Sequence, residues 1–240
     1  MTFAYNADCM EAMQAMPDKA FDLAVIDPPY GGGGVICGCR ASAPDFGGWF
    51  DRYEIKATRT GGGYAEKYGK SIEHWDVAPP PEYFKELFRV SKNQIIWGGN
   101  YFELPATRCF LVWRKLTISE GFTMAMCEYA WTSFNDNAKW IELAPQGKRG
   151  EQRFHPTQKP VELYRWILHH YAKPGDRILD THLGSGSSRI AAHDLGFDFV
   201  GYEIDKDYFD AQEKRFAAYT AQGSLFTEET PGGISYWSML

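Results

Sequence analysis

The chain has 240 residues, of which 44% are hydrophobic and 23% charged, and 25 Lys and Arg stand against 31 Asp and Glu for a net charge of −6. This length suits one α/β domain with a sizeable core. The acidic balance argues against a broad surface that coats nucleic acid, because phosphate binding needs clustered Lys and Arg.

The five cysteines and the absence of a long apolar stretch exclude further classes of protein. No segment is long and apolar enough to predict a membrane span. An odd number of cysteines, with no signal peptide at the start, argues against a secreted disulfide framework, so we expect a cytoplasmic protein. The spacing of Cys37 and Cys39 suits half of a metal site, but no second pair or nearby His completes it, so reduced thiols and no metal are expected.

Strands and helices alternate along the chain. The patterns predict strands at 2–5, 21–26, 94–97, 109–113, 124–134, 177–180 and 197–202, and helices at 9–16, 81–90, 157–171, 183–195 and 206–219. This alternation predicts an α/β fold with a doubly wound, mostly parallel sheet and helices on both faces. One domain would span 1–220, with an insertion at about 31–73, an irregular and basic segment at 135–153, and a flexible tail at 221–240.

The first candidate site is Asp27-Pro28-Pro29-Tyr30, which ends the apolar run 21–26. Ligands of open α/β sheets bind at the carboxyl ends of the strands, where this tetrad stands. Asp27 and the carbonyl of Pro28 can accept hydrogen bonds from an amino group, and Tyr30 can stack on a planar base. A plain turn at the end of a strand is the alternative reading.

The second candidate site joins Asp180, the glycine turn of Gly184 and Gly186, and Glu203. A strand, a glycine turn, a helix and a second strand that ends in an acidic residue form a nucleoside-binding βαβ unit. Glu203 can accept hydrogen bonds from both ribose hydroxyls. The third glycine of the dinucleotide fingerprint is absent, so a dinucleotide is not expected.

Together these motifs resemble the amino-group DNA methyltransferases, which transfer a methyl group from S-adenosyl-L-methionine to adenine N6 or cytosine N4. The resemblance rests on the Asp27 tetrad, on 180–187 with 201–203, and on 154–160, which is similar to the methionine-side cofactor motif of the family. The tetrad precedes the cofactor glycines, as in the circularly permuted β group. The resemblance therefore implies a Rossmann-like methyltransferase fold that covers most of the chain outside the insertion and the tail.

The resemblance also implies roles for single residues. Asp27, Pro28, Pro29 and Tyr30 would be catalytic, with the target base flipped out of the DNA so that Tyr30 stacks on it. The cofactor would contact Asp8, Cys9, Asp27, His155, Thr157, Lys159, Asp180, Gly184, Ser185, Gly186, Ser187 and Glu203. DNA would contact Arg40, Arg52, Lys148, Arg149 and Arg153, in the insertion and in the short segment that replaces a larger recognition domain.

Aspartate at the first tetrad position is typical of the adenine enzymes of this family, so adenine N6 is the expected target, with cytosine N4 as the alternative. An RNA or protein-amide methyltransferase and a non-catalytic, nucleic-acid-binding subunit also fit these motifs. Thr181-His182 departs from the usual Pro-Phe of the family, which leaves the contacts there open, including a general-base role for His182. A restriction-modification context and a homodimer are consistent with the family as well, and 222–226 resembles a sliding-clamp peptide.

Overall fold

The computed structural model describes residues 1–30, 77–120, 125–147 and 153–222. The strands are β1 Thr2–Asn6, β2 Phe21–Ile26, β3 Ser91–Trp97, β4 Phe110–Lys115, β5 Cys127–Thr132, β6 Lys139–Leu143, β7 Arg177–Asp180 and β8 Asp198–Glu203. The helices are α1 Cys9–Gln14, α3 Pro81–Val90, α4 Val161–Tyr171, α5 Ser187–Asp194 and α6 Lys206–Gln222, with a short 3-10 turn at Gly99–Tyr101. Within these ranges no helix has the length and apolar character needed to cross a bilayer.

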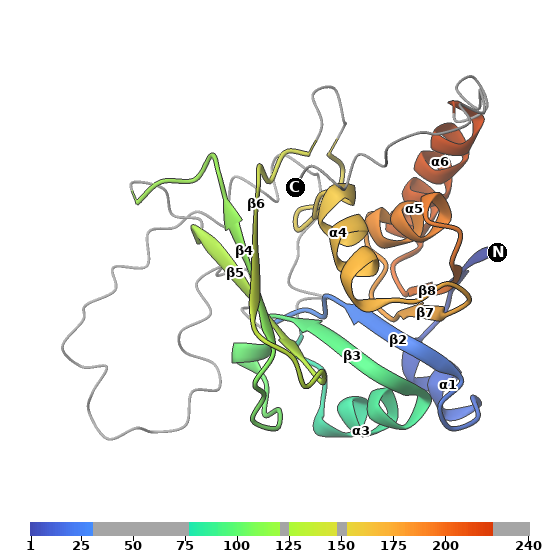
Figure 1. Ribbon diagram of the computed structural model, residues 1–240. Helices are drawn as coiled ribbons and strands as arrows, with labels where there is room; N and C mark the ends of the chain where they lie inside the picture. Colours follow the sequence, from blue (N-terminus) through green and yellow to red (C-terminus); the bar gives the residue numbers. More distant parts are fainter. Residues whose placement is uncertain (31–76, 121–124, 148–152, 223–240) are drawn as a thin grey trace.

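The eight strands form one sheet in the order β1-β8-β7-β2-β3-β5-β4-β6 (Figure 1). The five strands from β1 to β3 run parallel, β5 is antiparallel to both β3 and β4, and β6 is parallel to β4. The expected mostly parallel α/β sheet is therefore confirmed.

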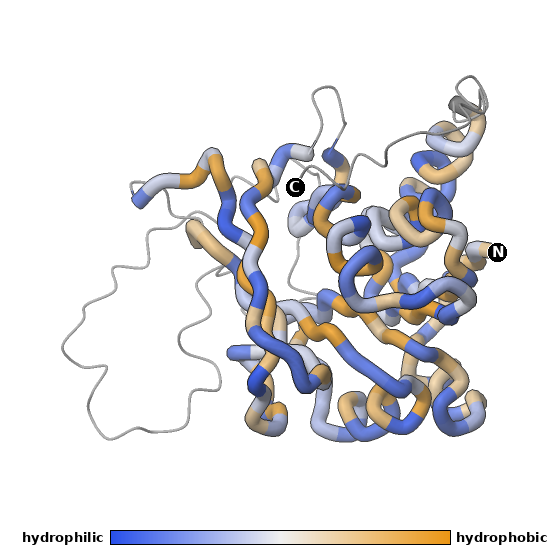
Figure 2. The backbone as a smooth tube through the Cα atoms, viewed as in Figure 1, coloured by the Kyte–Doolittle hydropathy of each residue, from blue (hydrophilic) through white to orange (hydrophobic). Residues whose placement is uncertain are grey.

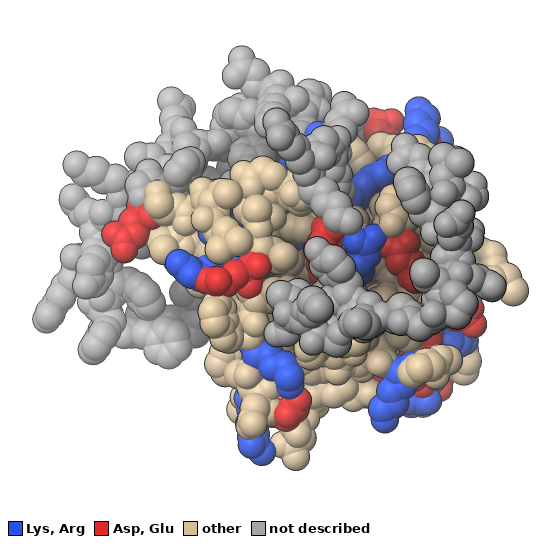
Figure 3. All heavy atoms as spheres, turned by 45° about the horizontal axis from the view of Figure 1, so that its top comes forward, with Lys and Arg blue, Asp and Glu red and all other residues tan. Residues whose placement is uncertain are grey.

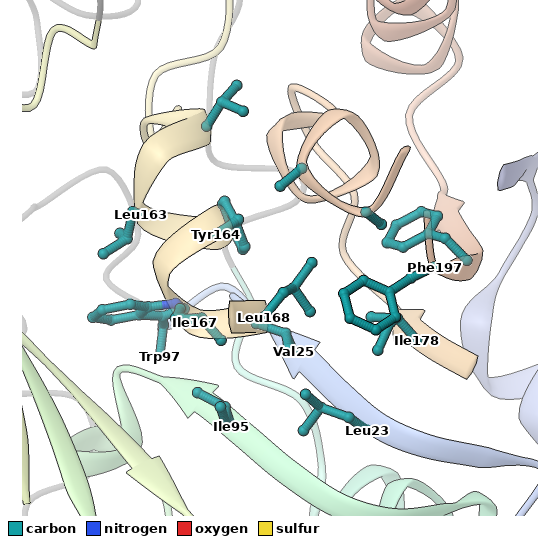
Figure 4. Packing of buried hydrophobic residues seen from close by; sticks show 14 of the residues in the cluster. Leu23, Val25, Ile95, Trp97, Leu163, Tyr164, Ile167, Leu168, Ile178 and Phe197 are labelled. Carbon is teal, nitrogen blue, oxygen red and sulfur yellow. The ribbon is translucent and has the colours of Figure 1, made fainter. Parts of the chain in front are cut away.

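Helices cover both faces of the sheet. The alternation of β2 sends Leu23 and Val25 into a cluster with α4 and α5, and Ala24 and Ile26 into a second cluster with α1 and α3. Figure 4 shows α4 lying over β2 and β3 in the first cluster. Figure 2 shows mainly hydrophobic residues along β2, as expected for a strand that is buried on both faces.

Most predicted elements agree with the structure, and β2, α3 and β7 have the predicted boundaries. The prediction that 135–153 is irregular is wrong, because β6 lies within it as the edge strand beside β4. The helix predicted from 157 begins only at Val161, because a residue that precedes a proline disfavours the helical conformation. Residues 221–222 belong to α6 rather than to a tail.

The parallel strands bring their carboxyl ends to one edge of the sheet. In the order of the sheet, β7 is followed in the chain, after α5, by its neighbour β8, toward the β1 edge. β2 is followed, after α3, by its neighbour β3, toward the β6 edge. The neighbours β7 and β2 are therefore the topological switch point, where open α/β sheets bind ligands. Asp180 ends β7 and Asp27 follows β2, so the two candidate sites meet at this point.

Candidate active site

Asp27 follows β2 and is held by two side chains. The side chain of Asp27 is 13% exposed. Its Oδ1 accepts a hydrogen bond from the Tyr30 hydroxyl at 2.9 Å, and its Oδ2 is ion-paired with the ammonium group of Lys159. Each carboxylate oxygen has a further lone pair, so Asp27 can still accept a hydrogen bond from a ligand.

The ring of Tyr30 lies among residues that follow β3. It stacks on Tyr101, with 4.7 Å between ring centroids, and contacts the edge of Phe102. A Cβ atom at Gly98 would lie 2.1 Å from Cε1 of Tyr30, so the ring needs a glycine at that position. A planar ligand that stacks on Tyr30 must therefore replace Tyr101 or use the opposite face of the ring.

Lys159 connects Asp27 to two further charges that sequence reasoning missed. Its Nζ lies 3.1 Å from Oε2 of Glu128 on β5, and Oε1 of Glu128 lies 2.5 Å from Nζ of Lys115 on β4. The side chains of Lys159 and Lys115 are 4% and 6% exposed. Charged residues at inward-facing positions of two apolar strands were the signal in the sequence, because a buried charge needs a partner.

Burial and pairing oppose each other in this cluster. Burial raises the pKa of Asp27 above its usual value, although Lys159 acts in the opposite direction. Burial would also raise the pKa of Glu128, but Lys159 and Lys115 hold it below its usual value. Burial would lower the pKa of Lys159, yet the two carboxylates raise it. Lys159 is therefore a cation between two carboxylate groups.

Asp180 lies across the switch point from Asp27. Its Oδ1 accepts a hydrogen bond from the backbone N–H of His182 at 3.0 Å, and its Oδ2 accepts one from the Ser188 hydroxyl at 2.5 Å. Burial is the main cause that raises its pKa to about 7, and the negative charges of Asp27 and Glu203 act in the same direction. Asp180 is therefore a destabilised carboxylate at neutral pH, as is common where a protein binds a ligand.

Glu203 ends β8 and is joined to the glycine turn. Its two carboxylate oxygens accept hydrogen bonds from the backbone N–H groups of Gly184, at 2.8 Å, and Asp205, at 2.9 Å. Burial raises its pKa. Gly184 and Gly186 have φ of 50° and 75°, which other residues rarely adopt. The predicted unit of glycine turn and acidic residue is thus present as one hydrogen-bonded structure.

The two serines of the turn connect it to α6. Arg215 donates hydrogen bonds to the backbone carbonyl of Ser185 at 2.7 Å and to the hydroxyl of Ser187 at 3.0 Å. The hydroxyl groups of the two serines lie 3.1 Å apart. These contacts fix the backbone of the turn before α5 begins.

The predicted motif 154–160 reaches the same turn. His155 is buried, and a Cβ atom at Gly184 would lie 3.4 Å from its ring. Its Nδ1 lies 3.2 Å from the Thr157 hydroxyl. Burial lowers the pKa of His155 to about 3, so its ring is neutral. His155 therefore lies with the glycine turn, whereas Lys159 lies with Asp27.

Asp8 and Cys9 begin α1. The carboxylate of Asp8 caps that helix by accepting a hydrogen bond from the N–H of Met10 at 2.7 Å. Burial raises the pKa of Cys9 to about 12, so its thiol stays protonated. Asn6, at the end of β1, donates to the backbone carbonyl of Glu203 at 2.8 Å, so this corner of the sheet adjoins the glycine turn.

His182 lies in a polar contact beside the switch point. Its Nδ1 is 3.0 Å from the Thr181 hydroxyl, which lies 2.6 Å from the hydroxyl of Tyr83. Burial lowers the pKa of His182 to about 4. The ring of His182 is therefore neutral and only weakly basic at neutral pH, and its general-base role stays a prediction.

The residues predicted to contact DNA are only partly described. Arg40, Arg52, Lys148 and Arg149 lie outside the described residues. Arg153 donates hydrogen bonds to the backbone carbonyls of Pro145, at 3.3 Å, and Gln158, at 2.9 Å, so it is folded against its own chain. On the face shown in Figure 3, the basic and acidic side chains of the described residues are interspersed.

Part of the chain is similar to a known protein family. Residues 107–214 match the family model of the N6 and N4 methyltransferases, described as DNA methylase. This part of the chain is therefore similar to the DNA methylase family. The matched stretch includes Glu128, Lys159, Asp180 and Glu203, and the Asp27 tetrad lies before it.

Three further proteins are similar to this chain over most of its length. The type II methyltransferase M.HinfI of Haemophilus influenzae is 24% identical over 88% of this chain and 67% of its own. The structure of TTHA0409 from Thermus thermophilus, in complex with S-adenosyl-L-methionine, covers 91% of this chain and 95% of its own, at 17% identity and a TM-score of 0.50. The cytosine-N4-specific PvuII DNA methyltransferase covers 95% and 87%, at 12% identity and a TM-score of 0.56. The structural likenesses confirm the expected methyltransferase fold.

Proposed function

We propose that this protein transfers a methyl group from S-adenosyl-L-methionine to the exocyclic amino group of a base in DNA, and that the base is adenine, methylated at N6. The observation that carries the proposal is the position of Asp27, a partly buried hydrogen-bond acceptor at the switch point of a DNA methylase fold. Aspartate at this position supports adenine by analogy within the family, and cytosine N4 is the alternative.

The residues across the switch point fit the cofactor. Glu203 has carboxylate oxygens that each accept one backbone hydrogen bond, which leaves lone pairs for the two hydroxyls of a ribose. The next residue, Ile204, is 66% exposed and offers an apolar surface to an adenine ring. Gly184 lies beside Glu203, where a residue without a Cβ atom allows close approach of a ligand to the backbone. We therefore assign the nucleoside to this unit.

The remaining predicted contacts divide into two groups. His155 and Thr157 adjoin the glycine turn and stay candidates for the methionine part of the cofactor, with Ser185 and Ser187 as supports of the turn. Asp8 caps α1 near the corner of β1 and β8 and stays a candidate for contact with the adenine of the cofactor. Lys159 is instead paired with Asp27, which favours a role on the substrate side.

When bound, S-adenosyl-L-methionine supplies an electrophilic methyl group. The residues of the chain then act on the amino group that receives it. An exocyclic amine conjugated to its ring is a poor nucleophile, and acceptors at Asp27 and the carbonyl of Pro28 would hold its hydrogens so that the lone pair becomes available. Tyr30 would hold the base by stacking. This is catalysis by positioning and electrostatics.

The base identity is tested by mass spectrometry of nucleosides from DNA that the purified protein has methylated. We expect N6-methyladenine, and N4-methylcytosine as the sole product would overturn the adenine assignment. RNA and protein substrates offered in parallel test the other methyltransferase readings. Cofactor binding without transfer to any of these substrates would support the non-catalytic reading.

Contact with DNA through Arg40, Arg52, Lys148, Arg149 and Arg153 stays part of the proposal. Removal of these charges should weaken DNA binding and lower its dependence on salt, because each phosphate contact releases counterions. An unchanged salt dependence would locate the DNA contact elsewhere in the chain.

A further inference from the structure

Three charged residues lie in series behind Asp27, whose role as the acceptor in the proposed function is the basis of this inference. Lys115 on β4, Glu128 on β5, Lys159 just before α4 and Asp27 just after β2 form a continuous series of alternating charges. Asp27 is the end of the series that faces the switch point. Three of the four side chains are less than 15% exposed, and Glu128 is 23% exposed.

Lys159 has one ammonium group and two carboxylate partners. Its Nζ is shared between Oδ2 of Asp27 and Oε2 of Glu128 and lies 5.4 Å from the centre of the Trp97 ring. A lysine is a compact charge on a flexible stem, so a single partner would fix it poorly. Glu128 is itself fixed by Lys115, whose Nζ lies 5.2 Å from the centre of the Trp113 ring. Glu128 and Lys115 therefore fix the position of the Lys159 ammonium group from the side opposite Asp27.

This sharing matters for the acceptor strength of Asp27. If Glu128 were neutral, the whole charge of Lys159 would act on Asp27, the only other carboxylate paired with it in the described part of the chain. A carboxylate bound so tightly to one cation is a weaker acceptor for an incoming amino group. It would also be drawn toward Lys159, and a displacement of about 1 Å in a reacting group can cost about 10²-fold in rate.

We propose that Glu128, anchored by Lys115, is a positioning residue for methyl transfer, which holds Lys159 so that Asp27 stays an aligned and available acceptor for the target amino group. Glu128 touches neither the substrate nor the cofactor in this proposal. It acts through Lys159 alone.

The first test is Glu128→Gln, with its effect on both rate and pH profile. We expect kcat to fall by about 10-fold or more, with the Kd for S-adenosyl-L-methionine unchanged, because the glycine turn and Glu203 are not touched. The acidic limb of the kcat profile should move down by about one pH unit, since a negative charge that opposes ionisation of Asp27 is gone. A residue with a merely structural role would lower kcat without moving this limb.

Lys159→Met gives the opposite shift. Removal of the positive charge beside Asp27 should move the acidic limb up, because burial then acts on Asp27 without its main compensation. The groups that face Asp27 from the surrounding elements are Lys159, Glu128, Tyr30, Tyr164 and Asp180. The two variants change only Lys159 and Glu128, so opposite shifts of the acidic limb separate the effects of these two charges from those of the other groups.

A measurement without cofactor or DNA supports the same comparison. Carboxyl 13C chemical shifts of Asp27, assigned with Asp27→Asn, report its titration in the protein alone. The midpoint should fall in Glu128→Gln and rise in Lys159→Met. If Glu128→Gln does not fold because the buried Lys115 loses its carboxylate partner, the double variant Lys115→Met with Glu128→Gln removes both members of that pair. We expect the same loss of kcat in that double variant.

Glu142→Gln is the matched control. Glu142 lies on β6 and pairs with Arg114, whose side chain is on the opposite face of β4 from Lys115. Its kcat and pH profile should equal those of the wild type. If the wild type is active and Glu128→Gln keeps its kcat and acidic limb, the inference is wrong and the proposed function stands. If the wild type methylates no DNA, the proposed function fails, while the 13C titration still decides whether Glu128 controls Asp27.

Discussion

Asp180→Asn tests whether a buried carboxylate limits the stability of the protein at neutral pH. Asp180 is 2% exposed and accepts hydrogen bonds from the N–H of His182 and the hydroxyl of Ser188. Asparagine has the same shape, and its carbonyl oxygen can accept the first hydrogen bond while its amino group donates to the hydroxyl oxygen. The substitution therefore keeps both contacts and removes only the charge.

The expected magnitude follows from the pKa of Asp180. Burial is the main cause that raises this pKa from 3.8 to about 7. Because the folded protein holds the proton more tightly than the unfolded chain, this group favours folding fully below about pH 4, and the contribution is lost as the pH rises through about 7. At about 1.4 kcal/mol for each pKa unit, the loss is about 4 kcal/mol.

Urea unfolding of both proteins measures the effect. The free energy of unfolding of Asp180→Asn should exceed that of the wild type, and the excess should grow by about 3 kcal/mol between about pH 5 and about pH 8. Asp210→Asn, which removes an exposed carboxylate paired with Lys206, should follow the wild type at both pH values. An excess that does not change with pH would refute the reasoning.

Three further predictions concern the site and the end of the chain. Asp27→Ala should abolish tritium transfer from labelled S-adenosyl-L-methionine. Calorimetry should still show cofactor binding within about threefold of the wild type, because Asp27 lies apart from the nucleoside unit. Near-normal turnover would contradict the mechanism. Gly98→Ala should reduce methyl transfer and stability, because the added Cβ atom would displace the Tyr30 ring. The control is Gly196→Ala, where φ is a similar 74° and no atom lies within 4 Å of the added Cβ atom. It should cost about 1–2 kcal/mol of stability and leave the rate unchanged. In 222–226, replacement of both Leu225 and Phe226 by alanine should abolish capture by the host sliding clamp without a change in melting temperature. A lower melting temperature with intact capture would show instead that these residues pack on the protein.

The elements that a local pattern defines could be predicted closely. A β-branched run stopped by two prolines predicts β2 with its true boundaries, and Pro81 in the first turn does the same for α3. The glycine turn and the acidic residue that follows it also predict their own contact, because the strand, turn and helix between them have a standard geometry.

Other features depend on neighbours that the local sequence does not contain. The run Lys139–Leu143 is short, and Trp140 is 64% exposed, so its pattern does not indicate a buried strand. It becomes β6 because β4 offers a free edge. The positive charge of Arg153 predicts contact with DNA, but only the structure shows that its guanidinium group also donates hydrogen bonds to two backbone carbonyls of its own chain.

The sequence by itself determined the order of the strands and helices other than β6, the α/β class, and the placement of Asp27, Asp180 and Glu203 at strand ends, since periodicity, prolines and glycines act over a few residues. Only the tertiary structure decided which charges meet there. Lys159 and Asp27 are 132 residues apart, and Glu128 reaches Lys159 because β5 runs antiparallel to β3 within the same sheet. Such a buried series of charges exists only after the strands have paired, because the exclusion of water makes each charge depend on its partner.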